Sequence, residues 1–177
     1  MSKQDFLVEL GTEELPPKSL SKLSKSFKAG VIDGLKNESL AHGKVKSFAT
    51  PRRLAVLVYS LEKKQPDRLT EKIGPAVKAS FDADGNPTRA AEGFAKSCGV
   101  VVADLGRANK AGVEKLSYST MLSGKPTNEL LPAIVNGALA KLPIPKKMRW
   151  GSSRDEFVRP VHWLVMLFGE EVIASTI

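Results

Sequence analysis

The hydrophobic pattern at the start of the chain predicts a short strand followed by a helix. Residues 6–10 form the apolar run FLVEL, which Gly11 and the Pro16-Pro17 pair close as at the end of a strand. Apolar residues then recur every three or four positions, at Leu20, Leu23, Phe27 and Val31. This spacing predicts an amphipathic helix. Its opposite face carries four lysines, Lys18, Lys22, Lys25 and Lys36. We interpret this lysine stripe as a solvated face, with RNA contact as the alternative.

Two runs rich in β-branched and aromatic residues follow, at 45–49 and 54–61. The segment Thr50-Pro51-Arg52-Arg53 separates them, and its proline cannot donate to a strand ladder, which places it in the connection or on a sheet edge. The second run, LAVLVYSL, is apolar on both sides, as expected of a strand covered on both faces. The first 61 residues are therefore predicted to be β-α-β-β.

The charged stretch EKKQPDRLTEK at 62–72 lacks periodicity and predicts a linker over residues 63–72. This linker divides the chain into a subdomain at 1–62 and a second subdomain at 73–177. Residues 172–177 have the composition of a strand, with neither a turn nor a polar tail after them. We therefore expect the second subdomain to be truncated at its C-terminal end.

The second half of the chain also alternates between helical and strand patterns. A turn at 82–87 leads to a helix that Thr88 caps and Gly99 ends. A strand is predicted at 113–122, then a helix from Thr127 or Leu131 to Leu142, and a strand, rather than a buried helix, at 161–168. The expected fold class is α+β, with mixed but largely antiparallel sheets and packed helices, in one domain or two small subdomains.

Composition narrows the class of protein further. The chain has 177 residues, of which 42% are hydrophobic, so it can bury a core. It has no apolar run of the ~20 residues that a membrane span needs and no secretory signal, which predicts a cytoplasmic protein without membrane contact. The single cysteine, Cys98, is expected to be a small buried apolar residue. The net charge of +8 indicates a polyanion such as RNA only weakly.

Most motifs for chemistry fail on spacing. Asp82, Asp84 and Asn86 match the first ligands of a calcium loop, but Pro87 stands where that loop needs glycine, so we predict a turn instead. The sequence contains no HExxH, P-loop, GxGxxG or GxSxG motif. His162 lies in an apolar run, which favours a core or interface residue over a catalytic base.

Three carboxylates near the first helix, Glu9, Glu13 and Glu14, are a possible acid and base pair. We interpret them instead as complementing the positive end of the helix dipole, an effect of ~0.3–1 kcal/mol each. No catalytic residue and no metal ligand is therefore assigned.

Basic residues form one further group, with an aromatic residue among them: Lys146, Lys147, Arg149, Trp150, Arg154 and Arg159. Such a group can bind phosphates while the indole stacks on a base, although a buried Trp150 among solvated charges explains the pattern equally well. Charge and loop placement give six candidates for RNA contact, namely Arg52, Arg53, Lys146, Lys147, Arg149 and Trp150.

Five longer strings carry a resemblance to a known family. They are FLVELGTEELPP at 6–17, TPRRLAVLV at 50–58, GPAVKASFDADGNPTRAAEGFAKSCGV at 74–100, LPIPKKMRWG at 142–151 and FVRPVHWLV at 157–165. In this order they are similar to the β subunit of the bacterial two-subunit glycyl-tRNA synthetases. The resemblance covers nearly the whole chain and identifies it as an N-terminal part of such a subunit, before the HD-type and anticodon-binding regions of the family.

This resemblance implies partners and a process rather than an active site. It implies an α subunit in an α2β2 assembly, which makes glycyl-adenylate from glycine and ATP with magnesium, and it implies tRNA(Gly) as the substrate, without DNA. No cofactor is expected in this chain. We expect the chain to support glycine attachment through tRNA contact, subunit assembly or both. The alternatives are a hydrolytic editing domain for mischarged tRNA and a purely structural interface scaffold.

Overall fold

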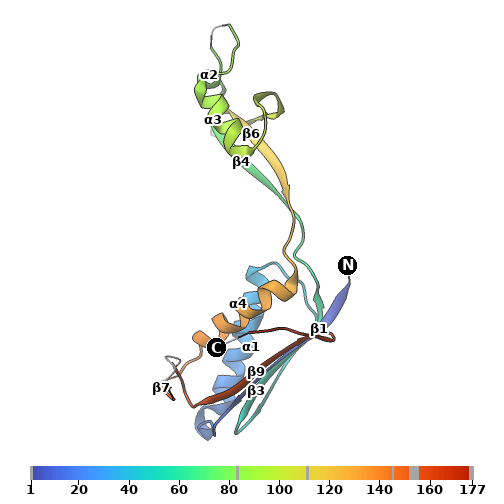
Figure 1. Ribbon diagram of the computed structural model, residues 1–177, viewed down its shortest axis with the longest axis vertical. Helices are drawn as coiled ribbons and strands as arrows, with labels where there is room; N and C mark the ends of the chain where they lie inside the picture. The colour runs from blue at the N-terminus through green and yellow to red at the C-terminus, as the bar shows by residue number, and fades with distance from the viewer. Residues whose placement is uncertain (1, 83, 111, 145, 152–155, 176–177) are drawn as a thin grey trace. The chain divides into compact units, whose positions relative to one another are not determined.

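A computed structural model describes residues 2–82, 84–110, 112–144, 146–151 and 156–175 (Figure 1). The chain forms two compact units. Unit 1 contains residues 1–66 and 124–177, and unit 2 contains the intervening residues 67–123. The expected α+β class with antiparallel sheets is confirmed, because every strand pairing in the described residues is antiparallel.

Unit 1 is a five-stranded sheet with two helices, together with a short two-stranded ribbon. The sheet has the order β10-β9-β1-β3-β2, with β1 in its centre. Its strands are β1 (Lys3–Thr12), β2 (Val45–Thr50), β3 (Arg53–Glu62), β9 (Val161–Phe168) and β10 (Glu171–Val172). The helices are α1 (Pro17–Asn37) and α4 (Thr127–Ala140). The ribbon pairs β7 (Met148–Arg149) with β8 (Glu156–Phe157).

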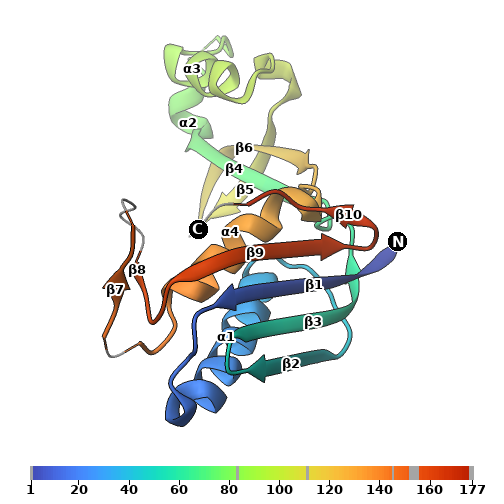
Figure 2. The same ribbon diagram turned by 60° about the horizontal axis from the view of Figure 1, so that its bottom comes forward.

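Both helices cover the same face of this sheet, and Figure 2 shows the strands in front of α1 and α4. Alternate residues of the strands are buried toward the helices, as the pleat of a strand dictates. The strands contribute Phe6, Val8, Leu10, Leu54, Val56, Val58, Met166 and Phe168 to the core. Leu23, Phe27, Val31 and Leu35 of α1 face them at helical spacing.

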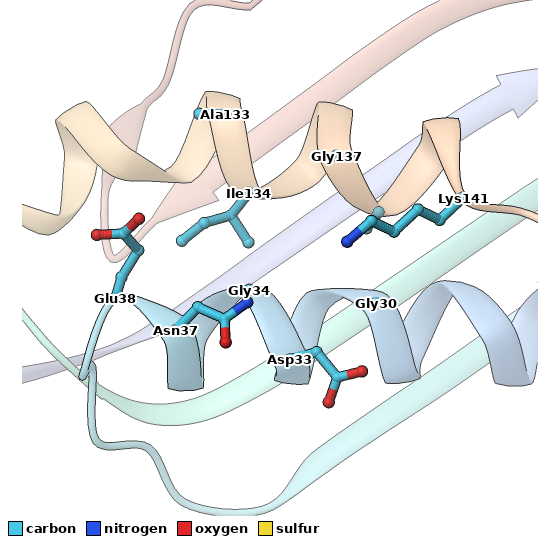
Figure 3. Close-up of a pocket in the computed structure, with 10 residues that line it drawn as sticks. Gly30, Asp33, Gly34, Asn37, Glu38, Ala133, Ile134, Gly137 and Lys141 are labelled. Atoms are coloured by element: carbon cyan, nitrogen blue, oxygen red, sulfur yellow. The ribbon is translucent and has the colours of Figure 1, made fainter.

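The two helices approach closely because glycines stand at their contact. A Cβ added at Gly30 would lie 2.9 Å from the Cβ of Ala138, and one added at Gly34 would lie 2.6 Å from Cγ2 of Ile134. Figure 3 shows the Ile134 side chain pointing toward α1 at Gly34. A groove of about 200 Å³ runs along this contact. Its shape follows from the missing glycine side chains.

Two segments of unit 1 lie side by side where the chain leaves it and returns. The backbone N–H of Gln65 donates to the carbonyl of Lys125 at 3.0 Å, and the Thr127 hydroxyl donates to the Glu62 carbonyl at 2.6 Å. Gln65 and Thr127 are both buried. A Cβ at Gly124 would collide with the Gln65 carbonyl, so this contact of two backbones requires glycine.

Unit 2 is a small three-stranded sheet with short helices. The sheet has the order β4-β6-β5, from β4 (Arg68–Ala76), β5 (Gly106–Lys110) and β6 (Val113–Leu122). Its helices are α2 (Val77–Ser80), α3 (Arg89–Cys98) and the 3-10 turn Val102–Asp104. Ala91, Ala95 and Leu116 are buried in it, and the Phe94 ring lies against Gly74. Unit 2 therefore has few large buried side chains among the described residues.

The second half of the expected linker at 63–72 is a strand, because β4 begins at Arg68. Residues 68–72 are all exposed, so the strand has no buried side to create an alternating pattern. Backbone pairing with β6, from Arg68 opposite Leu122 to Ile73 opposite Ser117, holds it instead. A search for apolar alternation cannot find such a strand.

The expected division into 1–62 and 73–177 also differs from the structure. Residues 124–177, expected in the second subdomain, belong to unit 1, because α4 packs on α1 and β9 pairs with β1. These contacts join residues about 100 or more positions apart, which no local pattern records.

The other expected elements are confirmed, with small shifts at their ends. The β-α-β-β order of the first 61 residues is observed, and α1 begins at Pro17. Thr88 is the residue before α3, but its hydroxyl donates to the Ala79 carbonyl and accepts no hydrogen bond from the helix N–H groups, so the expected side-chain cap is wrong. The final strand expected at 172–177 is shorter, as β10 ends at Val172, and residues 176–177 lie outside the described residues. No helix in the described part of the chain has the length and apolar character of a membrane span.

Candidate functional site

The sheet of unit 1 has a face that no described helix covers, and its exposed side chains gather near the end of β1. Successive residues of a strand point to opposite faces. Glu9 and Gly11 of β1 therefore lie on the open face, opposite the buried Val8 and Leu10. Gly11 pairs with Arg53 of β3 on one side and with Trp163 of β9 on the other. One row across three strands thus places a cation, a glycine and an indole side by side.

The Trp163 indole lies over Gly11, and a hydrogen bond holds the N–H edge of its ring. A Cβ on Gly11 would collide with the six-membered ring of the indole, so the absent side chain makes room for it. The indole N–H donates to Oε1 of Glu9 at 3.2 Å. The Arg53 guanidinium lies 5.6 Å from the ring centroid, within the range of a cation–π contact, and 3.7 Å from the same Glu9 oxygen.

The loop after β1 is fixed on both sides by backbone hydrogen bonds. Thr12 donates to the carbonyl of Arg52 at 2.9 Å, and Leu15 donates to that of Pro51 at 2.7 Å. On the other side, Glu13 donates to the carbonyl of Pro160 at 2.9 Å. These bonds hold Glu13 between the β2–β3 turn and the start of β9, where its Oε1 accepts a hydrogen bond from Nε2 of His162 at 2.9 Å.

These segments enclose an open cavity of about 510 Å³. We call it the β1-end cavity, and it is lined by Thr12, Glu13, Arg52, Arg53, His162 and Trp163. Its volume is within the ~300–1,000 Å³ of small-molecule sites. Two arginines, a histidine and an indole supply donors and an aromatic face, and the carboxylates of Glu9 and Glu13 oppose part of the positive charge. Arg52 has no carboxylate partner among the described residues.

The structure brings the candidates Arg52 and Arg53 together with residues that the sequence analysis did not select. The other four candidates lie between α4 and β8. Lys146, Lys147 and Arg149 are exposed, whereas Trp150 is partly buried and packs against the core. Nε of Arg149 lies 2.7 Å from Oε1 of Glu156, its partner in the β7–β8 ribbon, so this charge is paired. The exposed indole beside cations is therefore Trp163.

The two other arginines of the basic group have different places. Arg159 donates from Nε to the carbonyl of Glu14 at 3.1 Å and from Nη1 to the carbonyl of Val158. It therefore supports the loop that carries Glu13. Arg154 lies outside the described residues.

The turn at 82–87 is confirmed as a turn that a carboxylate stabilises. Oδ1 of Asp82 accepts the backbone N–H of Asn86 at 2.7 Å and that of Asp84 at 3.0 Å. The Asn86 backbone N–H is the main cause that holds the pKa of Asp82 below its ordinary value. This carboxylate is thus occupied by its own turn, as in an Asx-turn.

The structure also places three singly considered groups of residues. His162 lies on the exposed surface beside Glu13, since it stands at the open end of β9, so of the two expected places the core is excluded and an interface stays a prediction. Glu9 and Glu13 contact Arg53, Trp163 and His162, so these two carboxylates have partners other than the α1 dipole, and the role expected of Glu9, Glu13 and Glu14 at that helix end stays a prediction. Cys98 is partly exposed, at the end of α3.

The sequence contained one signal for Trp163, which was not among the predicted site residues. Trp163 and Val165 have the opposite parity in β9 to the buried Met166 and Phe168, so a half-covered strand would expose the indole. The pairing of β9 with β1, which brings Glu9 and Gly11 to Trp163, has no local signal. Among the described residues, no group of three or more His, Cys, Asp or Glu side chains could hold a metal ion.

Comparison with known proteins gives one consistent result. Residues 6–177 match the profile of the family described as "Glycyl-tRNA synthetase beta subunit". The chain is 54% identical over 177 residues to the glycine–tRNA ligase beta subunit of Marinobacter nauticus and 55% identical to that of Pseudomonas savastanoi pv. phaseolicola. With that of Stutzerimonas stutzeri it shares 54% identity over 173 residues. These matches cover 98–100% of this chain and 25–26% of the relatives, so the chain spans about a quarter of their length.

Proposed function

The chain belongs to the glycyl-tRNA synthetase beta subunit family, and from this premise we propose that it is the N-terminal part of a subunit that binds tRNA(Gly) for glycine attachment. In this proposal the α subunit performs the chemistry with ATP, magnesium and glycine in the cytoplasm. The present chain then contributes binding and assembly, in keeping with a site of exposed cations and an indole.

The observation that carries this proposal is the β1-end cavity. RNA is bound through phosphate contacts from arginine and lysine and through aromatic faces that accept bases. Arg52, Arg53 and Trp163 supply both kinds of group on one open surface. Lys146 and Lys147 add exposed positive charge in the same unit. The lysine stripe of α1 is exposed as expected, and it is the alternative surface for RNA.

Salt dependence of tRNA binding tests the proposal. Each phosphate contact contributes about 0.7–0.9 to the slope of log K against log salt. The double variant Arg52→Ala/Arg53→Ala is expected to flatten this slope by about 1 to 2, because it removes up to two contacts. Replacing Lys146, Lys147 and Arg149 by alanine tests the second group in the same way.

A matched control removes the same charge elsewhere. Lys78→Ala/Lys96→Ala takes two exposed cations from unit 2, and its slope is expected to equal that of the unaltered chain. The measurement is filter binding of tRNA(Gly) between about 50 and 200 mM salt. Absence of binding at the lowest salt, or equal slopes for all variants, would contradict tRNA contact by these residues.

Unit 2 favours a second role, in subunit assembly. Leu69 of β4 and Met121 of β6 are direct cross-strand partners, and they are 69% and 64% exposed. Leu122, next along β6, is also exposed. Adjacent exposed apolar side chains of this kind are typical of protein contacts. We propose that this apolar pair contacts another part of the synthetase assembly, as in the scaffold hypothesis.

Mixing with the α subunit tests this second role. Leu69→Ser/Met121→Ser is expected to weaken complex formation by about tenfold or more, as the loss of a buried apolar contact does. Thr70→Ser/Thr120→Ser, at the neighbouring cross-strand pair, is the control. Analytical ultracentrifugation reads out the complex. Equal assembly of the first variant and the control would exclude the apolar pair from the interface.

A further inference from the structure

Trp163 differs from the other tryptophan of the chain in what surrounds it. Trp150 packs against the core, whereas Trp163 lies on the open face and is 39% exposed. Val165, two residues further along β9, is also exposed on that face, and Phe48 is exposed on the edge strand β2, with β1 and β3 between it and β9. In Figure 2 this face of the sheet, made by β9, β1, β3 and β2, lies in front of both helices. An exposed indole on the surface of an antiparallel sheet is available to a planar ligand.

The indole is held in place before any ligand arrives. One side of the ring faces the backbone of Gly11, and the bond from Nε1 to Glu9 limits its rotation. A side chain fixed in this way loses little conformational entropy when it binds. Glu9 also accepts Arg53, so one carboxylate positions both the aromatic ring and a guanidinium.

The cations beside the indole are placed to meet a phosphate. Arg52 and Arg53 stand at the turn between β2 and β3, and backbone bonds from Thr12 and Leu15 fix that turn. Guanidinium groups bind phosphate oxygens through paired N–H donors. The β1-end cavity, at about 510 Å³, is in the size range of sites that hold a ligand as large as one nucleotide.

The carboxylates at the cavity favour a ligand with few charges. Glu9 is shared by Trp163 and Arg53, and Glu13 accepts a hydrogen bond from His162, so two carboxylates lie beside the two arginines of the cavity. Among the described residues, Arg52 is the arginine of the cavity that no carboxylate pairs with, and it stands beside an aromatic face. This balance suits a single base with its adjoining phosphate better than a polyphosphate, which would meet both carboxylates.

We propose that the β1-end cavity binds one unpaired nucleotide of an RNA, with its base stacked on Trp163 and its phosphate on Arg52 and Arg53. This inference rests on the proposed tRNA binding and adds to it the form of the contact. Double-helical RNA buries its base faces in the stack, so the site selects a loop, a bulge or a single-stranded end.

Two single-tryptophan variants make the indole its own reporter. Trp150→Phe leaves Trp163 as the only tryptophan, and Trp163→Phe leaves Trp150. Short single-stranded oligoribonucleotides of cytidine or adenosine are added to the complete chain while its fluorescence is recorded. Stacking is expected to quench the emission of Trp150→Phe and to leave that of Trp163→Phe unchanged. A duplex of the same length is expected to quench neither.

Affinity provides the second readout, which does not depend on the fold of Trp150→Phe. Trp163→Ala removes an exposed side chain and is expected to bind the oligonucleotides about 5- to 150-fold more weakly, the range for one stacked base. Trp163→Phe, which keeps an aromatic face, is expected to retain most of the affinity. Circular dichroism confirms that each variant keeps its secondary structure.

The outcomes separate this inference from the proposed function. If tRNA binds with a salt slope that depends on Arg52 and Arg53, but Trp163→Ala binds it as well as the unaltered chain, stacking is overturned and tRNA contact stands. If neither tRNA nor the oligonucleotides bind at low salt, both are overturned. Quenching in Trp163→Phe and none in Trp150→Phe would show that the base stacks on Trp150, and would overturn the assignment of stacking to Trp163.

Discussion

At the scale of single residues, the site depends on a glycine that has no unusual backbone conformation. Gly11 is a strand residue of β1, and the structure requires it for space, because any side chain there would meet the Trp163 ring. The indole therefore lies flat on the sheet only while position 11 is glycine. Gly11 and Trp163 are therefore expected to depend on each other.

Gly11→Ala is predicted to displace the indole and to leave the fold intact. Because Trp163 is exposed and can move, we expect a loss of less than about 1 kcal/mol in the free energy of unfolding, as for surface substitutions. Oligonucleotide affinity is expected to fall as in Trp163→Ala, and the double variant is expected to lose no more than either single one. A double variant with additive losses would show that the two residues act separately.

Asp82 gives a prediction about acid pH. Its pKa is lowered in the folded chain, first by the Asn86 backbone N–H, so the turn is stabilised above the ordinary pKa of 3.8. This stabilisation is lost as the pH falls below that value through the folded pKa. The Asn86 amide resonance, followed by NMR, should titrate with a midpoint below 3.8. In Asp82→Asn that titration should vanish, and a midpoint at or above 3.8 would contradict the account.

At the scale of elements, the sequence was informative wherever one side of an element is buried. The pattern predicted α1 and α4 because each buries residues at helical spacing. The run at 54–61 was expected to be a strand covered on both faces; β3 is a strand, but only its alternate residues are buried, and its other side lies on the open face of the sheet. It missed β4, whose first five residues are all exposed. An apolar period in the sequence reflects burial of one side of an element. A strand that is held by backbone pairing alone therefore has no such period.

The α1–α4 contact provides a test at this scale. Gly30→Ala is predicted to destabilise unit 1, because overpacking costs about 1–3 kcal/mol and exceeds the ~1 kcal/mol that alanine gains in a helix. Its added Cβ would lie 3.0 Å from the Cα of Ala138. Gly137→Ala in α4 meets no atom within 4 Å and is predicted to stabilise by up to about 1 kcal/mol. Urea unfolding measures both, and equal shifts would contradict the close packing.

At the scale of the whole molecule, unit 2 is an insertion into unit 1, and this could not be predicted from the sequence. The central strand β1 pairs with β3 nearby in sequence and with β9 about 150 residues later. The first pairing follows the β-α-β-β order, but the second depends on tertiary packing. The candidate site divides in the same way, since Arg52 and Arg53 were predicted and Trp163 was not.

The insertion predicts that unit 1 folds without residues 67–123. Gln65 and Lys125 are joined by a backbone hydrogen bond, so the two ends left by the deletion are adjacent and a short Gly-Ser linker can join them. The shortened chain should show one cooperative thermal transition and bind oligonucleotides like the complete chain. Loss of the transition would show that unit 1 depends on unit 2.

The central claim is that unit 1 contacts RNA at the end of β1, and photo-cross-linking tests it most directly. A tRNA(Gly) transcript is irradiated with the complete chain, and the peptides that carry nucleotide adducts are mapped by mass spectrometry. The account predicts adducts at Trp163 and in the turn that holds Arg52 and Arg53. Adducts confined to unit 2, or to the lysine stripe of α1, would contradict it.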